Sequence, residues 1–81
     1  MKDVCIYYRV HRDGEMELAF ENVAEKYNGE EIGGGTDFVT RDIQYYIPDE
    51  SALLFCSEVC VILQEYDVTN VRIDVETVRE D

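Results

Sequence analysis

Cysteine and histidine are the residue types in this 81-residue chain that most directly suggest metal or nucleophilic chemistry. Cys56 and Cys60 stand four positions apart, so on a helix their sulfur atoms would share one face, but zinc requires four ligands. Cys5 and His11, the single histidine, lie on one expected strand at a separation of roughly 20 Å, too far to share an ion. We therefore expect no metal or other cofactor, and we predict that the cysteines are buried structural residues.

An acid–base pair of His11 with Asp13, or with a carboxylate of the last strand, would be needed for general acid–base catalysis. Such a pair also needs a pocket that shifts its pKa values, and one small four-stranded domain has little room for a pocket. The chain is therefore predicted not to be an enzyme.

A run of three glycines, Gly33 to Gly35, has backbone N–H groups that could surround a phosphate. A phosphate-binding loop follows a strand, precedes a helix and usually carries a lysine, whereas this run is flanked by Glu30, Glu31 and Asp37 and leads into another strand. We favour a bulged or strongly twisted edge strand, and whether the run binds a ligand stays open.

The elements that must position these residues follow from the periodicity of the apolar positions. Alternation predicts strands, in chain order, over 4–10, 30–38, 43–47 and 71–75. Helical spacing predicts one helix that is capped by Asp13 and stops at Asn28-Gly29, and a second that is capped by Asp49 and ends near Asp67.

The resulting order, βαββαβ, places the chain in the α+β class. Right-handed crossovers then predict a ferredoxin-like domain, in which an antiparallel sheet of order 4132 carries both helices on one face. The length allows one domain over 1–81, with 79–81 a frayed tail. Because this fold hosts many activities, it does not by itself indicate a function.

Charge excludes several classes of partner. Nineteen acidic residues against seven basic ones give a formal net charge of −12, which repels phosphate backbones and anionic membranes. The apolar stretch near 52–63 is too short to span a membrane, and the beginning of the chain does not resemble a signal peptide. Three cysteines without a dense framework fit a reducing compartment, so we expect a cytoplasmic protein.

The outward sides of the two predicted helices carry acidic residues with apolar residues between them. Glu17, Glu21 and Glu25 recur every four positions, about 6 Å apart along a helix, and none has a basic residue three or four positions later. We call this candidate partner-binding site the outer helical surface. The alternative interpretation of the same residues is an acidic face that is only solvated. The outer helical surface consists of Glu17, Leu18, Glu21, Glu25, Leu54, Glu58, Val61 and Glu65.

The uncovered face of the sheet is the second candidate site. Its aromatic residues could stack on bases, but nearby carboxylates favour self-association or a protein partner over RNA. The predicted members on the central strands are Tyr7, Arg9, His11, Gln44 and Tyr46, beside Arg72, Asp74 and Glu76.

These observations predict a non-enzymatic interaction protein that binds a basic partner. The partner could be a nucleic-acid-binding protein whose site the acidic surface occupies in place of phosphates. In size and charge the chain resembles the small acidic inhibitors that phages and other mobile elements make against host defence systems. The alternative is a small ligand-binding or regulatory domain that forms a homodimer through its sheet and responds to a metabolite near the glycine run.

Overall fold

Strands and helices follow one another along the chain in the order βαββαβ that the periodicity predicts. The computed structural model describes residues 1–9, 14–36 and 39–78. A single turn of 3₁₀ helix, Asp49–Ser51, precedes the second helix. The main elements are β1 (Lys2–Arg9), α1 (Gly14–Lys26), β2 (Glu30–Thr36), β3 (Thr40–Ile47), α2 (Ala52–Glu65) and β4 (Arg72–Thr77).

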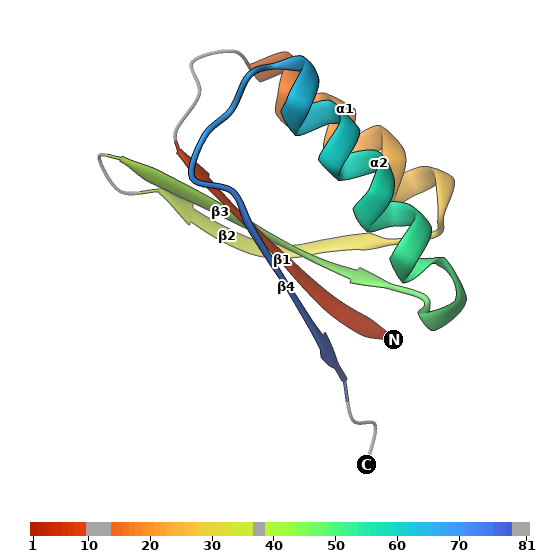
Figure 1. Ribbon diagram of the computed structural model, residues 1–81. Helices are drawn as coiled ribbons and strands as arrows, with labels where there is room; N and C mark the ends of the chain where they lie inside the picture. The colour runs from red at the N-terminus through yellow and green to blue at the C-terminus, as the bar shows by residue number, and fades with distance from the viewer. Residues whose placement is uncertain (10–13, 37–38, 79–81) are drawn as a thin grey trace.

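The four strands form one antiparallel sheet in the order β2-β3-β1-β4. β1 is central, because Ile6 lies opposite Ile43 of β3 on one side and opposite Ile73 of β4 on the other. β2 and β4 are the two edges (Figure 1). This is the predicted strand order, including the edge position of β2.

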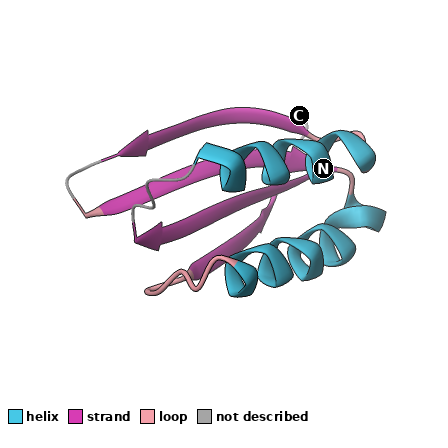
Figure 2. Cartoon of the chain, turned by 90° about the horizontal axis from the view of Figure 1, so that it is seen from above, coloured by secondary structure: helices cyan, strands magenta, loops and turns pink. Residues whose placement is uncertain are grey.

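Both helices lie across the same face of the sheet, and the core fills the space between the two layers (Figures 1 and 2). Alternation along β1 and β3 directs every second side chain toward the helices. Two edge-to-face aromatic contacts join the layers: Tyr8 with Phe20 and Tyr45 with Phe55, with ring centroids 6.0 and 5.4 Å apart. The core consists of Val4, Ile6, Tyr8, Met16, Phe20, Ala24, Ile43, Tyr45, Ile47, Ala52, Phe55, Val59 and Leu63.

The glycine run lies in β2, which is an edge strand with a bulge, as the sequence favoured. The register of β2 against β3 shifts between Glu31 and Gly33. A Cβ atom on Gly34 would lie 2.7 Å from the backbone oxygen of Asp42, so a side chain there would push the two strands apart. The run therefore leads from strand to strand, without the helix that a phosphate-binding loop requires.

Asn28 and Gly29 end α1 as predicted. Asn28 takes a left-handed conformation with φ of 58°, and the Gly29 N–H donates to the Ala24 carbonyl at 2.7 Å. The prediction for Asp49 is wrong: α2 begins after the 3₁₀ turn, and the Asp49 carboxylate forms an ion pair with the Met1 amino group at 2.9 Å. Asp13, the predicted cap of α1, lies outside the described residues, as do the predicted strand ends Val10 and Phe38 and the tail 79–81.

Candidate functional site

The outer helical surface keeps its apolar members exposed. Leu18 on α1 and Leu54 and Val61 on α2 are between 52% and 58% exposed. Each lies on the side of its helix opposite the buried stripe, because 3.6 residues per turn places positions 18, 54 and 61 away from the sheet. The two helices lie on the same face of the sheet (Figure 2) and contact each other. Together they present these large aliphatic side chains to solvent.

Glu17 does not carry the unpaired charge that the sequence predicted. Its carboxylate accepts a hydrogen bond from Arg41 Nε at 2.8 Å and another from the Tyr8 hydroxyl at 3.1 Å. The Arg41 guanidinium, and to a lesser degree the Tyr8 hydroxyl, hold the pKa of Glu17 below its usual value against the opposing effect of burial. Glu17 therefore ties α1 to β1 and β3, and its partner was missed because it comes from another element.

Glu58 is also paired, across the seam between the helices. Lys26 Nζ donates to its carboxylate at 3.0 Å, and the Tyr27 hydroxyl donates to the same group. These two bonds lower the pKa of Glu58, the Tyr27 bond most strongly. Glu58 thus joins the end of α1 to the middle of α2, so its charge is partly neutralised.

Glu21, Glu25 and Glu65 remain as the free carboxylates of the outer helical surface. All three are exposed, and within the described part of the chain none of them forms an ion pair. The sequence did not point to Glu31 of β2 as part of this surface. The pKa of the Tyr45 hydroxyl is raised mainly by burial, and next by the negative charges of Glu31 and Glu21. The acidic surface therefore extends from α1 toward the β2 edge.

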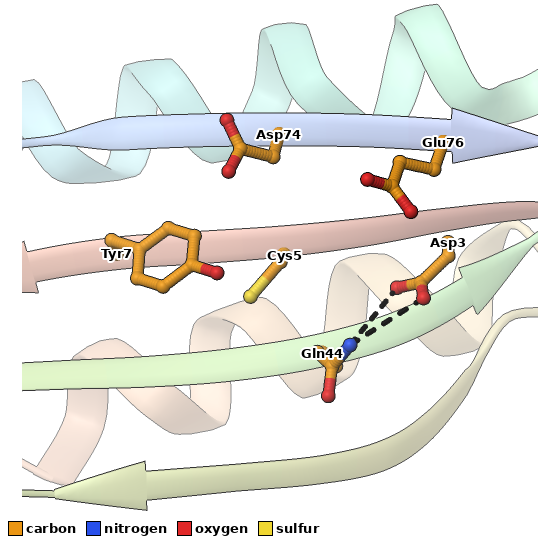
Figure 3. Close-up of a pocket in the computed structure, with 6 residues that line it drawn as sticks. All are labelled: Asp3, Cys5, Tyr7, Gln44, Asp74 and Glu76. Carbon is orange, nitrogen blue, oxygen red and sulfur yellow. Dashed lines mark hydrogen bonds between the residues drawn. The ribbon is translucent and has the colours of Figure 1, made fainter.

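The uncovered face of the sheet is acidic as well. A hollow of about 90 Å³ lies over β1 (Figure 3), and its lining residues are Asp3, Cys5, Tyr7, Gln44, Asp74 and Glu76. The Gln44 amide donates to Asp3 at 3.3 Å, which holds the amide against β1. Burial raises the pKa of the Cys5 thiol, and the surrounding carboxylates Asp42, Asp3 and Asp74 add to this effect. The surface around the hollow would repel a phosphate.

The aromatic residues of this face are not a free stacking platform. The Arg72 guanidinium lies 4.3 Å from the centre of the Tyr7 ring, and Arg72 also forms an ion pair with Asp74 at 3.1 Å. Tyr46 is half-buried and Arg9 is exposed, whereas His11 lies outside the described residues. Arg72, which lies over the Tyr7 ring, is therefore engaged with its own chain.

The cysteines occupy three different environments. Cys5 is buried on the uncovered face of the sheet, Cys56 is half-buried beside the core, and Cys60 is exposed. The prediction of burial is therefore wrong for Cys60, which lines an open hollow between α2 and β4. Within residues 1–9, 14–36 and 39–78, no three metal-ligating side chains are grouped around a common point.

Comparison with known proteins gives a fold but no family. No family model matches the chain, and no curated protein sequence matches it. Among solved structures, the de novo designed protein Foldit4 is similar, with a TM-score of 0.59, 15% sequence identity, and coverage of 99% of this chain and 98% of that one. At this identity the likeness concerns the arrangement of four strands and two helices alone. In the part of the chain that the structure describes, neither helix is long and apolar enough to cross a membrane.

Proposed function

We propose that the chain is a non-enzymatic interaction protein whose outer helical surface binds a basic site on another protein. The observation that carries the proposal is the combination of free carboxylates, Glu21, Glu25 and Glu65, with the exposed aliphatic side chains Leu18 and Val61 on two adjacent helices. Apolar side chains at the centre of a contact supply affinity, and charges around them speed association with an oppositely charged partner.

The acidic composition supports a partner that itself binds nucleic acid. A protein site that binds phosphates is lined by lysine and arginine, so a surface with several free carboxylates on two adjacent helices can occupy it. With a net charge of −12, and with carboxylates also on the uncovered sheet face, the chain is unsuited to bind nucleic acid directly. We propose that it acts as an inhibitor in the cytoplasm, on a ferredoxin-like scaffold.

Affinity capture with two charge-matched variants tests the proposal. The helical variant carries Glu21→Gln, Glu25→Gln and Glu65→Gln, and the sheet variant carries Glu30→Gln, Asp42→Asn and Glu76→Gln. Each removes three negative charges, so they differ only in the location of the change. From a lysate of the native host, a basic protein should be retained by the wild type and by the sheet variant, and lost with the helical variant.

The retained protein is then purified and given a labelled nucleic acid that it binds. Added wild-type chain should displace the nucleic acid in proportion to its occupancy, and the helical variant should not. A partner that is lost with the sheet variant instead would place the site on the uncovered sheet face and contradict the proposal. A retained protein that binds the chain and nucleic acid at the same time would contradict the inhibitor role.

A further inference from the structure

The edge strand β4 leaves an apolar groove open between itself and α2. Leu53 is 79% exposed on the helix side, Val75 is exposed on the strand side, and Val71, which directly precedes β4, is exposed as well. The groove measures about 510 Å³, and its lining contains one carboxylate, Asp49, which is paired with Met1. The lining residues are Lys2, Asp49, Ala52, Leu53, Cys56, Cys60, Ile73 and Val75. In a chain of net charge −12, this nearly neutral apolar groove differs from the surfaces described above.

Within residues 1–9, 14–36 and 39–78, no strand pairs with the outer edge of β4. The Val78 N–H donates to the Met1 carbonyl at 3.1 Å, so residues 1 and 78 form a hydrogen-bonded pair. Along an antiparallel ladder, hydrogen-bonded pairs alternate with non-hydrogen-bonded pairs. Residues 72, 74 and 76 therefore exchange hydrogen bonds with β1, whereas 73, 75 and 77 direct their N–H and C=O groups away from the sheet. Such an edge is a template for another strand.

A second copy of β4 fits this edge in one register. In a twofold-symmetric antiparallel pair, residues whose N–H and C=O groups point outward must lie opposite each other, so that they can exchange hydrogen bonds. When Ile73 lies opposite its own counterpart, each Arg72 lies opposite the partner's Asp74, and each Val71 lies opposite the partner's Val75. The register centred on Arg72 places the two Arg72 side chains directly opposite each other. The register centred on Asp74 pairs each Arg72 with the partner's Glu76, but it places the two Asp74 side chains opposite each other, which is unfavourable. The register centred on Ile73 is therefore the one that places no like charges directly opposite each other.

We infer that the chain forms a symmetric dimer through β4, in which the two sheets join into one continuous sheet. The pairing satisfies the free edge of β4 and covers Val71, Ile73 and Val75 with the same residues of the second copy, as a twofold interface requires. This surface is separate from the outer helical surface, so the inference does not rest on the proposed function. With both helical layers on the same side of the joined sheet, the dimer would present two copies of the outer helical surface in one direction.

Charge reversal at the paired positions tests the register. The wild type should have the mass of a dimer in sedimentation equilibrium at micromolar to submillimolar concentration. Arg72→Asp places two aspartates opposite each other and Asp74→Arg places two arginines opposite each other, so each variant alone should be a folded monomer by circular dichroism. Mixed in equal amounts they should form a heterodimer, because each arginine then faces an aspartate.

A lysine on each edge strand is the matched control. Val75→Lys places a charge in the apolar contact and should give a monomer, whereas Ile32→Lys on the β2 edge should leave the dimer intact. A wild type that remains monomeric at all concentrations would overturn the inference and leave the groove to another kind of occupant. Dimers that persist in both charge-reversal variants alone, or that respond to Ile32→Lys and not to Val75→Lys, would also overturn it.

Discussion

Glu17 shows how one carboxylate on a surface helix can belong to the fold. It accepts hydrogen bonds from Arg41 and Tyr8, and the resulting decrease in its pKa means that the folded state favours the charged form. Glu17→Gln should lower the free energy of unfolding at neutral pH by less than about 1 kcal/mol, since the carboxylate is partly exposed. The difference in free energy of unfolding between the variant and the wild type should have its full size above about pH 4.3, the usual pKa of a glutamate in an unfolded chain. It should vanish as the pH falls through the lower pKa of Glu17 in the folded state.

Urea unfolding of wild type and variant from pH 7 down to acid pH measures this effect. Glu21→Gln on the same helix is the control: it removes a like-charge neighbour of Glu25 and should leave stability equal or slightly higher at neutral pH. A Glu17→Gln variant that matches the wild type at pH 7 would show that the Arg41 contact is not stabilising.

The cysteines differ in what their side chains contribute to packing. Cys56 is half-buried beside the core and Cys60 is exposed. Cys56→Ala should therefore cost about 1 kcal/mol, in line with the loss of a small apolar group from a packed site. Cys60→Ala should change the unfolding free energy of a monomeric variant by a few tenths of a kcal/mol at most. Equal losses in the two variants, measured by thermal unfolding, would contradict this distinction.

At the scale of the element, the glycines of β2 have different roles. A methyl group on Gly34 would meet the Asp42 carbonyl, while one on Gly33 would make an ordinary contact with Gln44. Gly34→Ala should destabilise the protein by about 1–3 kcal/mol through displacement of the edge strand. Gly33→Ala should be neutral or stabilise by up to about 1 kcal/mol, because it restricts the unfolded chain. Denaturation midpoints that rank the two in the opposite order would refute this assignment.

The elements could be predicted from sequence because their periodicity is local. Alternation around Ile6, Ile43 and Ile73 predicted the central strand β1 and its two neighbours β3 and β4, and Asn28-Gly29 predicted the end of α1. The pairing of individual charges could not be predicted in the same way, because Arg41 reaches Glu17 from a strand far along the chain. For the same reason, the joint effect of Glu31 and Glu21 on Tyr45 and the groove between α2 and β4 depend on which elements are neighbours in the fold.

At the scale of the whole molecule, the two sides of the sheet carry different kinds of surface. The helical side combines free carboxylates with exposed aliphatic residues, and the uncovered side has carboxylates around Cys5. On the helical side the edge at β4 is apolar and nearly uncharged, whereas its uncovered face carries Arg72, Asp74 and Glu76. Association with a basic partner and association between two copies would therefore use different surfaces and can be tested independently.

The association rate with the captured basic partner, measured at two ionic strengths, tests the central claim most directly. For the wild type the rate should be high at low salt and should fall steeply as salt screens the charges. The variant with Glu21, Glu25 and Glu65 all replaced by Gln should associate more slowly and with a weaker dependence on salt, whereas Leu18→Ala should mainly speed dissociation. Unchanged association and dissociation rates in both variants would contradict the account, and would show that the outer helical surface is only solvated.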